Sequence, residues 1–213
     1  MLLAFDTATP YVSVAVLDED RVVAERRSEQ RLKHGEQLAP LIESSLADAG
    51  IVRQDLTALA VGVGPGPFTG LRVGLVTART LAFALDLPVY GVCSLDVLAL
   101  EAALGPDPVG ADFVVATDAR RKEVYLASYD DQGRRLDGPA VLRPADAATG
   151  GPAVGEGAAA DPGEFPGHRG PVYPSAGWLA RAVAEELAEL CDPEPLYLRR
   201  PDAIAPGAPK RVS

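Results

Sequence analysis

Two aspartates stand at the ends of two similar apolar segments, where paired carboxylates can hold a magnesium ion and its bound phosphates. Asp6 follows the apolar residues 2–5, and Asp118 follows residues 113–117. Asp6 precedes Thr-Ala-Thr-Pro, which lacks a glycine that lets backbone amides approach a phosphate, and Pro10 has no amide hydrogen. We therefore favour aspartates that each order a turn. A small-molecule kinase or ATPase that uses Asp6 and Asp118 remains the alternative.

The segment 61–74, Val-Gly-Val-Gly-Pro-Gly-Pro-Phe-Thr-Gly-Leu-Arg-Val-Gly, is the second candidate for phosphate binding. It joins an apolar strand to a helix, and the free amides of a helix N-terminus can face an anion. A P-loop needs Lys-Ser/Thr after its last glycine, whereas Gly70 precedes Leu71-Arg72. A dinucleotide loop needs glycine where Thr69 stands, and the two prolines remove amide donors. We therefore interpret the segment as a tight turn that leads into an apolar helix.

Metal or nucleophilic catalysis finds little support in the residue pattern. The chain has only two histidines, His34 and His168, and the position four after His34 holds Leu38. A pair of histidines on one helical face is therefore absent. No histidine is placed as a base for Ser94, which we interpret as a helix cap. The sequence predicts no catalytic residue and no metal site.

Composition narrows the class of protein further. The chain has 213 residues, 47% of them hydrophobic, and a formal net charge of −10 with scattered basic residues, which argues against unaided nucleic-acid binding. Cys93 and Cys191 lack ligand-like spacing and are expected to be reduced thiols. No signal peptide is recognised, and no uninterrupted apolar stretch reaches the roughly 18 residues of a membrane span. We expect a cytoplasmic protein without a membrane partner.

Periodicity predicts the elements that position these residues. A strand over 2–7 and two further strands are followed by helices and strands in alternation, which implies a partly parallel sheet. The expected elements of this first part are strands over 2–7, 12–17 and from 22, a helix over 35–49, a strand over 58–63, a helix over 69–85, a strand over 88–92 and a helix over 94–104.

The opening pattern returns after the Gly/Pro-rich linker 105–111. Strands are expected over 113–117, 124–129 and from 134, so that an apolar strand, an aspartate and a hairpin recur about 112 residues apart. This repeat indicates two related lobes, 1–104 and 105–213. The second lobe is reduced, because residues 144–174 are rich in Gly, Pro and Ala before a last helix that Ser175 caps and whose apolar face extends to Leu190.

The predicted helix 69–85 is apolar around nearly its whole circumference. Such a helix is either central in the fold or covered on its far side by another protein. Gly70, Gly74 and Ala78 form a small-residue stripe along it, where a second helix can come close. The sequence therefore favours a partner interface on this helix and on the neighbouring amphipathic helix 35–49.

Five motifs together resemble the TsaB family, also called YeaZ, over residues 1 to about 200. They are Asp6-Thr-Ala-Thr, His34-Gly-Glu-Gln, Gly64-Pro-Gly-Pro-Phe-Thr-Gly-Leu-Arg-Val-Gly, Asp118-Ala-Arg-x-x-Glu-Val-Tyr and Pro195-Leu-Tyr-Leu-Arg. The resemblance implies an α/β, two-lobed, actin-like ATPase (ribonuclease H-like) fold of the class of sugar kinases and chaperone ATPases. Each lobe would open with a strand-hairpin unit.

The resemblance also implies a function in tRNA modification. Members of this family are understood as non-catalytic relatives of TsaD, which carries a His-x-x-x-His metal site and transfers a threonylcarbamoyl group from its adenylate to adenosine 37 of tRNA. This chain has Leu38 in place of the second histidine. It would bind and activate TsaD, help to recruit the ATPase TsaE, and meet tRNA only indirectly. No cofactor would be bound by this chain alone, whereas the complex would use ATP.

The same resemblance implies a heterodimer with TsaD through the first two helices, the pair already indicated by their apolar residues. A homodimer of the isolated chain that serves another partner, such as a protein acetyltransferase, remains the alternative. The interface residues expected on the two helices are Leu38, Leu41, Ile42, Ser45, Gly70, Val73, Gly74, Val76, Thr77 and Leu81.

Overall fold

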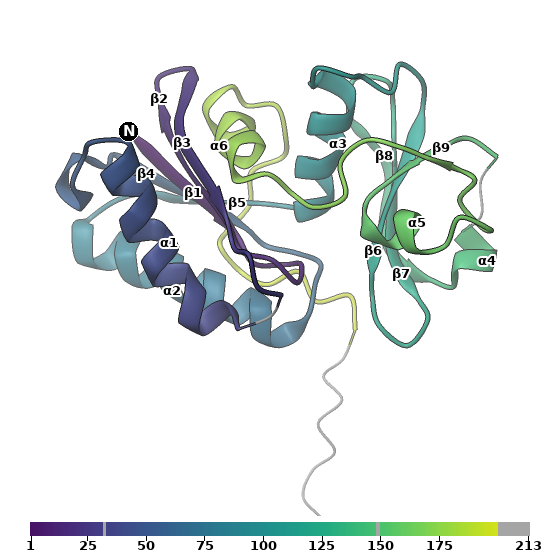
Figure 1. Ribbon diagram of the computed structural model, residues 1–213, viewed down its shortest axis with the longest axis horizontal. Coiled ribbons are helices and arrows are strands. Elements are labelled where there is room, and N and C mark those ends of the chain that lie inside the picture. The colour runs from purple at the N-terminus through teal and green to yellow at the C-terminus, as the bar shows by residue number, and fades with distance from the viewer. Residues whose placement is uncertain (32, 148–149, 200–213) are drawn as a thin grey trace, which may run out of the picture.

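The computed structural model describes residues 1–31, 33–147 and 150–199, and in them two five-stranded sheets lie side by side (Figure 1). The first sheet has the order β3-β2-β1-β4-β5 and consists of β1 (Leu2–Asp6), β2 (Ser13–Asp18), β3 (Arg21–Arg27), β4 (Ala58–Gly62) and β5 (Val89–Val92). The second has the order β10-β9-β6-β7-β8 and consists of β6 (Phe113–Asp118), β7 (Val124–Tyr129), β8 (Arg135–Leu142), β9 (Pro152–Val154) and β10 (Gly167–His168).

The two sheets repeat one topology. In the first, β1, β2 and β3 form an antiparallel meander, and β4 and β5 are added in parallel beside β1. In the second, β6, β7 and β8 form the same meander, and β9 and β10 are added in parallel beside β6. The strand-hairpin opening predicted for each lobe is confirmed. The second lobe is reduced, because β9 and β10 have only three and two residues.

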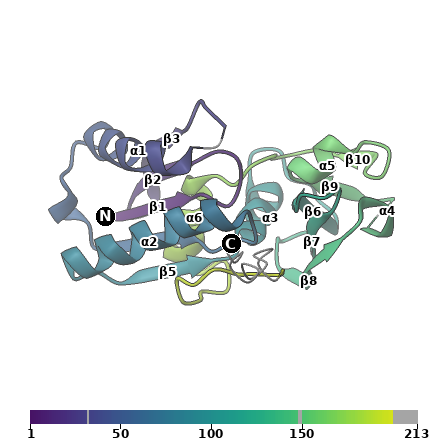
Figure 2. The ribbon, with the colours of Figure 1, turned by 90° about the horizontal axis from the view of Figure 1, so that it is seen from below.

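Helices cover both faces of the first sheet because its central strands are apolar on both faces. Leu3 and Phe5 of β1 pack against α1 (His34–Asp48) and α2 (Phe68–Leu85). Leu2 and Ala4 point the other way and pack against α6 (Ala176–Ala184). Figure 2 shows α1 and α2 running along the outside of this lobe. The last helix of the chain thus belongs to the core of the first sheet.

One helix, α3 (Ser94–Leu104), lies between the two sheets (Figure 1). Val97 and Leu100 pack into the cluster beneath the first sheet, whereas Leu95 and Leu98 pack against β6 and β7 of the second. The fully central helix of the fold is therefore α3 and not α2. The expected division into residues 1–104 and 105–213 stays a prediction. The remaining short helices are η1 (Arg53–Asp55), α4 (Pro144–Ala147) and α5 (Glu156–Ala160).

The structure corrects two details of the predicted helices. Cys93, not Ser94, is the N-cap of α3, because the Ser94 hydroxyl bonds elsewhere. Helix α6 is capped as predicted, since Ser175 Oγ accepts a 3.1 Å hydrogen bond from the amide of Trp178. It ends at Ala184, however, and the apolar face expected up to Leu190 is not helical there.

The expectation that no segment resembles a membrane span also needs correction. Among the described residues, α2 is long and apolar enough to cross a membrane by length and composition alone. Arg72 and Arg79 interrupt its apolar runs, but the mean hydropathy of the whole helix is high enough. One side of α2 packs on the first sheet, with Leu71, Leu75 and Ala78 buried.

Candidate functional site

The turn after β1 is held by the buried carboxylate of Asp6, which is 1% exposed. Its Oδ2 accepts a 2.5 Å hydrogen bond from the hydroxyl of Ser94, and its Oδ1 accepts a 2.7 Å bond from the amide of Ala8. Burial raises the pKa of Asp6, and these two hydrogen bonds act in the opposite direction. Both oxygens of Asp6 are therefore already engaged within the chain.

The glycines of segment 61–74 allow the chain to close over this turn. A Cβ at Gly66 would lie 2.2 Å from the carbonyl oxygen of Ala8, and one at Gly70 would lie 2.6 Å from that of Thr7. A Cβ at Gly74 would lie 2.3 Å from Thr7 Oγ1, which donates a 2.9 Å hydrogen bond to the Gly70 carbonyl. The small-residue stripe thus faces the chain's own turn. Its interpretation as the seat of a second helix is wrong.

His34, at the start of α1, closes the same turn from the other side. It is 8% exposed, and its Nε2 lies 2.7 Å from the carbonyl oxygen of Thr9. Leu38, one turn further along α1, is buried in the core of the first sheet. Within residues 1–31, 33–147 and 150–199, no cluster of three His, Cys, Asp or Glu side chains is arranged to hold a metal.

Asp118 orders the corresponding turn of the second lobe. Its Oδ1 accepts a 2.7 Å hydrogen bond from the amide of Arg120, as Asp6 Oδ1 does from Ala8. Its Oδ2 forms an ion pair of 3.2 Å with the Arg120 guanidinium. Asp118 is partly exposed, whereas Asp6 is enclosed. The interpretation of both aspartates as turn-ordering residues is confirmed, and each carboxylate is bonded within its own turn.

The outer face of α2 exposes large apolar side chains. Phe83 is 92% exposed, Val76 is 62% exposed and Phe68 is 39% exposed. Val76 and Phe83 are seven positions apart, about two turns of the helix, and share its solvent side, while Phe68 is the first residue of the helix; together they form the exposed strip of α2. Between Val76 and Phe83, Arg79 and Thr80 complete the wall of an open depression of about 340 Å³. Isolated exposed apolar residues are ordinary, whereas a row of them on one helix makes this face a candidate interaction surface.

A segment near the C-terminus is anchored at the start of this strip. The rings of Phe68 and Tyr197 stack with their centroids 5.2 Å apart. The Arg72 guanidinium lies 3.7 Å from the centre of the Phe68 ring, and Arg72 Nε donates a 3.2 Å hydrogen bond to the Tyr197 hydroxyl. Glu194 forms a 3.9 Å ion pair with Arg79. The exposed surface is therefore built from α2 together with residues 194–197.

The ten expected interface residues separate into two groups by burial. Five are buried within the chain and support the two helices: Leu38, Ile42, Ser45, Gly70 and Gly74. Five reach the surface to some extent: Leu41, Val73, Val76, Thr77 and Leu81. Phe68, Phe83 and Tyr197 belong to the exposed strip but were not expected there. The spacing of Val76 and Phe83, seven positions on one helix face, is the signal that points to Phe83.

Two lobes of one topology, each with an aspartate ordering the turn after its first strand, define an actin-like ATPase fold. Solved structures share this fold. YeaZ from Pseudomonas aeruginosa superposes with a TM-score of 0.77 at 31% identity, over 92% of this chain and 99% of that chain. A second Pseudomonas aeruginosa structure, described as similar to peptidase YEAZ, gives a TM-score of 0.78 at 31% identity, over 93% and 99% of the two chains.

Sequence comparison leads to the same family. The family model described as TsaD, tRNA N6-adenosine threonylcarbamoyltransferase, matches residues 21–203. TsaB of Escherichia coli, a tRNA threonylcarbamoyladenosine biosynthesis protein, is 38% identical over 67% of this chain and 62% of its own length. An uncharacterized protein of Mycobacterium tuberculosis is 44% identical over 95% of this chain and 93% of its own. The chain belongs to the TsaB (YeaZ) family.

Proposed function

We propose that the chain is a non-catalytic subunit in the biosynthesis of N6-threonylcarbamoyladenosine at position 37 of tRNA, and that it binds and activates a TsaD-type transferase in the cytoplasm. Family membership supports the pathway. The observation that carries the role of a binding subunit is the exposed apolar strip of α2, with Phe83 92% exposed and Val76 62% exposed. Covering such a strip with a partner removes apolar surface from water.

The enclosed turn after β1 supports a role without catalysis by this chain. Thr7, Ala8 and Thr9 are 0%, 3% and 5% exposed, because the glycine loop and His34 cover them. A phosphate bound at this turn would have to displace that cover. Leu38 replaces the second histidine of the His-x-x-x-His metal site that the resemblance assigns to TsaD. Chemistry at a metal therefore falls to the partner.

The proposed heterodimer interface consists of the surface-facing residues of α1 and α2. It includes Leu41, Val73, Val76, Thr77 and Leu81 from the expected set, extended by Phe83 and Phe68. Arg72 and Arg79 flank the strip, where Arg72 contacts Phe68 and Tyr197 and Arg79 pairs with Glu194, and a partner carboxylate would compete with Glu194 for Arg79. TsaE would join the complex of the two subunits, ATP would be consumed by that complex, and tRNA would be bound without direct help from this acidic chain.

The proposal is tested by reconstitution. The chain is mixed with the TsaD-type protein of its own organism, and the complex is measured by size-exclusion chromatography with light scattering. Threonylcarbamoyl transfer to tRNA is then followed with and without the chain. A heterodimer and a transfer rate that depends on the chain are expected. A transferase that works equally well alone, or two proteins that elute separately, would refute the proposal.

The alternative, a kinase or ATPase of the same fold, has a separate test. Isothermal titration with Mg-ATP measures nucleotide binding by the isolated chain. Micromolar affinity that is lost in both Asp6→Asn and Asp118→Asn would establish the alternative, provided that circular dichroism shows both variants folded. Size measurement of the isolated chain and of its mixture with the transferase distinguishes a homodimer from the proposed heterodimer.

A further inference from the structure

A pocket of about 630 Å³ lies on the side of the first sheet opposite α2. It is bounded by β3, by the C-terminal half of α3 and the residue Pro106 beyond it, and by the beginning of α6. Its volume is in the range of small-molecule sites. The lining residues are Val22, Glu25, Arg26, Arg27, Glu101, Pro106, Ser175, Gly177, Trp178 and Arg181.

The arginines in this wall already have partners. Arg26 makes a two-pronged ion pair with Asp48, in which Nη2 lies 2.9 Å from Oδ1. Arg181 pairs with Glu185 at 2.7 Å and lies 4.2 Å from the centre of the Trp178 ring.

Arg27 is held more weakly, because its Nη2 donates to the neutral carbonyl oxygens of Tyr173 and Pro174 at 3.4 and 3.5 Å. Two of the three arginines of the pocket, Arg26 and Arg181, are thus paired with carboxylates of the chain itself.

The two carboxylates of the pocket are in different situations. Glu25 Oε1 accepts hydrogen bonds from the Ser175 hydroxyl at 2.8 Å and from the Gly177 amide at 3.2 Å. Glu101 Oε2 is buried and has no hydrogen-bond partner among the described residues. A buried polar atom without a hydrogen-bond partner destabilises the fold. Because Glu101 lines the pocket, a ligand bound there would supply the donor that its Oε2 lacks. Glu101 is therefore the group of this pocket that remains to be satisfied.

The charges around Glu101 indicate which donor fits. Burial and, after it, the negative charge of Glu25 raise the pKa of Glu101 to about 7, although the positive charge of Arg27 acts in the opposite direction. A cationic donor near Glu101 would satisfy its oxygen and interact favourably with both carboxylates. The indole of Trp178 adds an aromatic surface against which the carbon chain of a ligand can pack.

We propose that the pocket between β3, α3 and α6 binds a small molecule that carries an ammonium or guanidinium group, with Glu101 as its hydrogen-bond acceptor. Glu25 supplies the second negative charge, and Trp178 packs against the apolar part of the ligand. Because the pocket and the α2 strip lie on opposite faces of the sheet, this site is independent of the proposed heterodimer interface.

The test is isothermal titration of the full chain with agmatine, which has an ammonium and a guanidinium group. Binding is expected to release about half a proton at pH 7, because Glu101 with a pKa of about 7 is then half protonated and a bound cation favours its charged form. Titrations in buffers of different ionisation enthalpy measure this number. The neutral diol 1,4-butanediol, of similar chain length, is expected not to bind.

Variants decide whether Glu101 is the acceptor. Glu101→Gln keeps the shape but removes the charge, and it should weaken agmatine binding at least about tenfold and abolish proton release. Glu43→Gln, an exposed glutamate on α1, is the matched control and should bind like the parent. If Glu101→Gln does not fold by circular dichroism, Glu25→Gln replaces it, with the same expected direction. Absent binding at about 10 mM agmatine, equal binding of the diol, or unchanged affinity in the glutamine variant would overturn the proposal.

Discussion

The hydroxyl of Ser94 donates a 2.5 Å hydrogen bond to the buried carboxylate of Asp6, across 88 positions of the sequence. Ser94 Oγ also accepts a 3.2 Å bond from the amide of Gly64. One side chain thus joins the end of β1, the glycine loop and the first residue of α3. The central helix between the two lobes is thereby fixed to the turn that the glycine loop covers.

Removing this hydroxyl should destabilise the chain. Ser94→Ala takes one of two hydrogen bonds from a carboxylate that is 1% exposed, and we expect a loss of about 2 kcal/mol in the free energy of unfolding. Ser44→Ala is the matched control, because the Ser44 hydroxyl bonds only to the Pro40 carbonyl within α1, and it should cost less than about 0.5 kcal/mol. Urea unfolding measures both. Equal stabilities of the two variants would contradict this role of Ser94.

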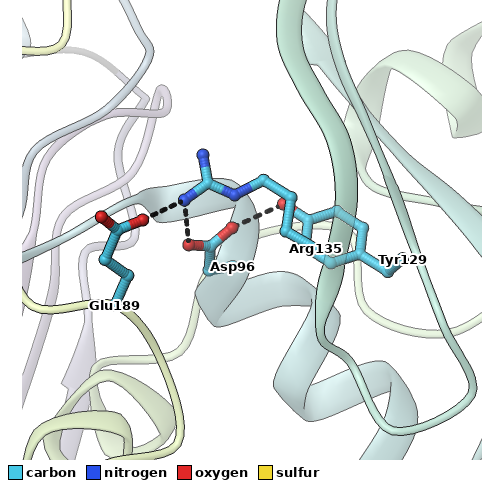
Figure 3. A network of polar contacts seen from close by, with 4 residues as sticks. All are labelled: Asp96, Tyr129, Arg135 and Glu189. Carbon is cyan, nitrogen blue, oxygen red and sulfur yellow. Dashed lines mark hydrogen bonds and ion pairs between the residues drawn. The ribbon is translucent and has the colours of Figure 1, made fainter.

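A second polar network joins the lobes around Asp96 of α3 (Figure 3). Asp96 accepts a 2.8 Å hydrogen bond from the Tyr129 hydroxyl and forms a 3.2 Å ion pair with Arg135, which also lies 3.3 Å from Glu189. Arg135→Met should cost about 3 kcal/mol, because it leaves a buried carboxylate without its cation. Glu189→Gln should cost less than about 1 kcal/mol, because the Glu189 side chain is 80% exposed. Unfolding curves that rank the two variants the other way would refute this assignment.

The stability of the chain should depend on pH through Glu101. Its pKa is raised from 4.5 to about 7 in the folded chain, so the folded state holds this proton more tightly than the unfolded state. Its contribution is fully present below pH 4.5 and is lost as the pH rises through 7. Relative to the parent, Glu101→Gln should therefore gain stability between pH 5 and pH 8, on the order of 1 to 2 kcal/mol after solvent screening. A difference that is the same at both pH values would contradict the raised pKa.

A charge placed on the α2 strip should break the heterodimer without unfolding the chain. Phe83 is 92% exposed, so Phe83→Arg should change the free energy of unfolding by less than about 0.5 kcal/mol. It should weaken binding of the TsaD-type partner at least about tenfold, because the arginine would be buried without a counter-charge. Val73→Arg and Leu41→Arg are poorer probes, because both side chains are half-buried against the core.

Leu136→Arg is the control for this experiment, since Leu136 is 59% exposed on β8, in the other lobe. It should bind the partner like the parent chain. Calorimetry or surface plasmon resonance gives the affinities. If Phe83→Arg and Leu136→Arg bind equally well, the interface does not include the strip on α2.

Local patterns in the sequence predicted much of this fold. The recurrence of an apolar strand, an aspartate and a hairpin corresponds to two sheets of one topology, and the turns at Asp6 and Asp118 use the same hydrogen bond. The apolar circumference of α2 indicated a helix with more apolar surface than its sheet can cover. These features depend on periodicity and on nearby residues, which a sequence displays directly.

Contacts between distant residues were not predictable in this way. Serine is a residue type favoured at helix N-caps, and only the fold shows that the Ser94 hydroxyl faces Asp6. Asp96 sits on an otherwise apolar helix, and its partners Tyr129 and Arg135 follow 33 and 39 residues later. The stripe at Gly70 and Gly74 has the spacing of a helix-packing surface, but the turn at Thr7 fills it. The spacing of small residues on a helix indicates that another segment packs closely there, but it does not indicate which segment.

The most direct test of the proposed function is depletion of this protein in its own organism, followed by nucleoside analysis of total tRNA. N6-threonylcarbamoyladenosine is expected to fall in step with the protein and to be restored by the parent gene and by the Leu136→Arg variant, but not by Phe83→Arg. Unchanged N6-threonylcarbamoyladenosine after depletion would contradict the proposed function. Full restoration by Phe83→Arg would contradict the role of the α2 strip.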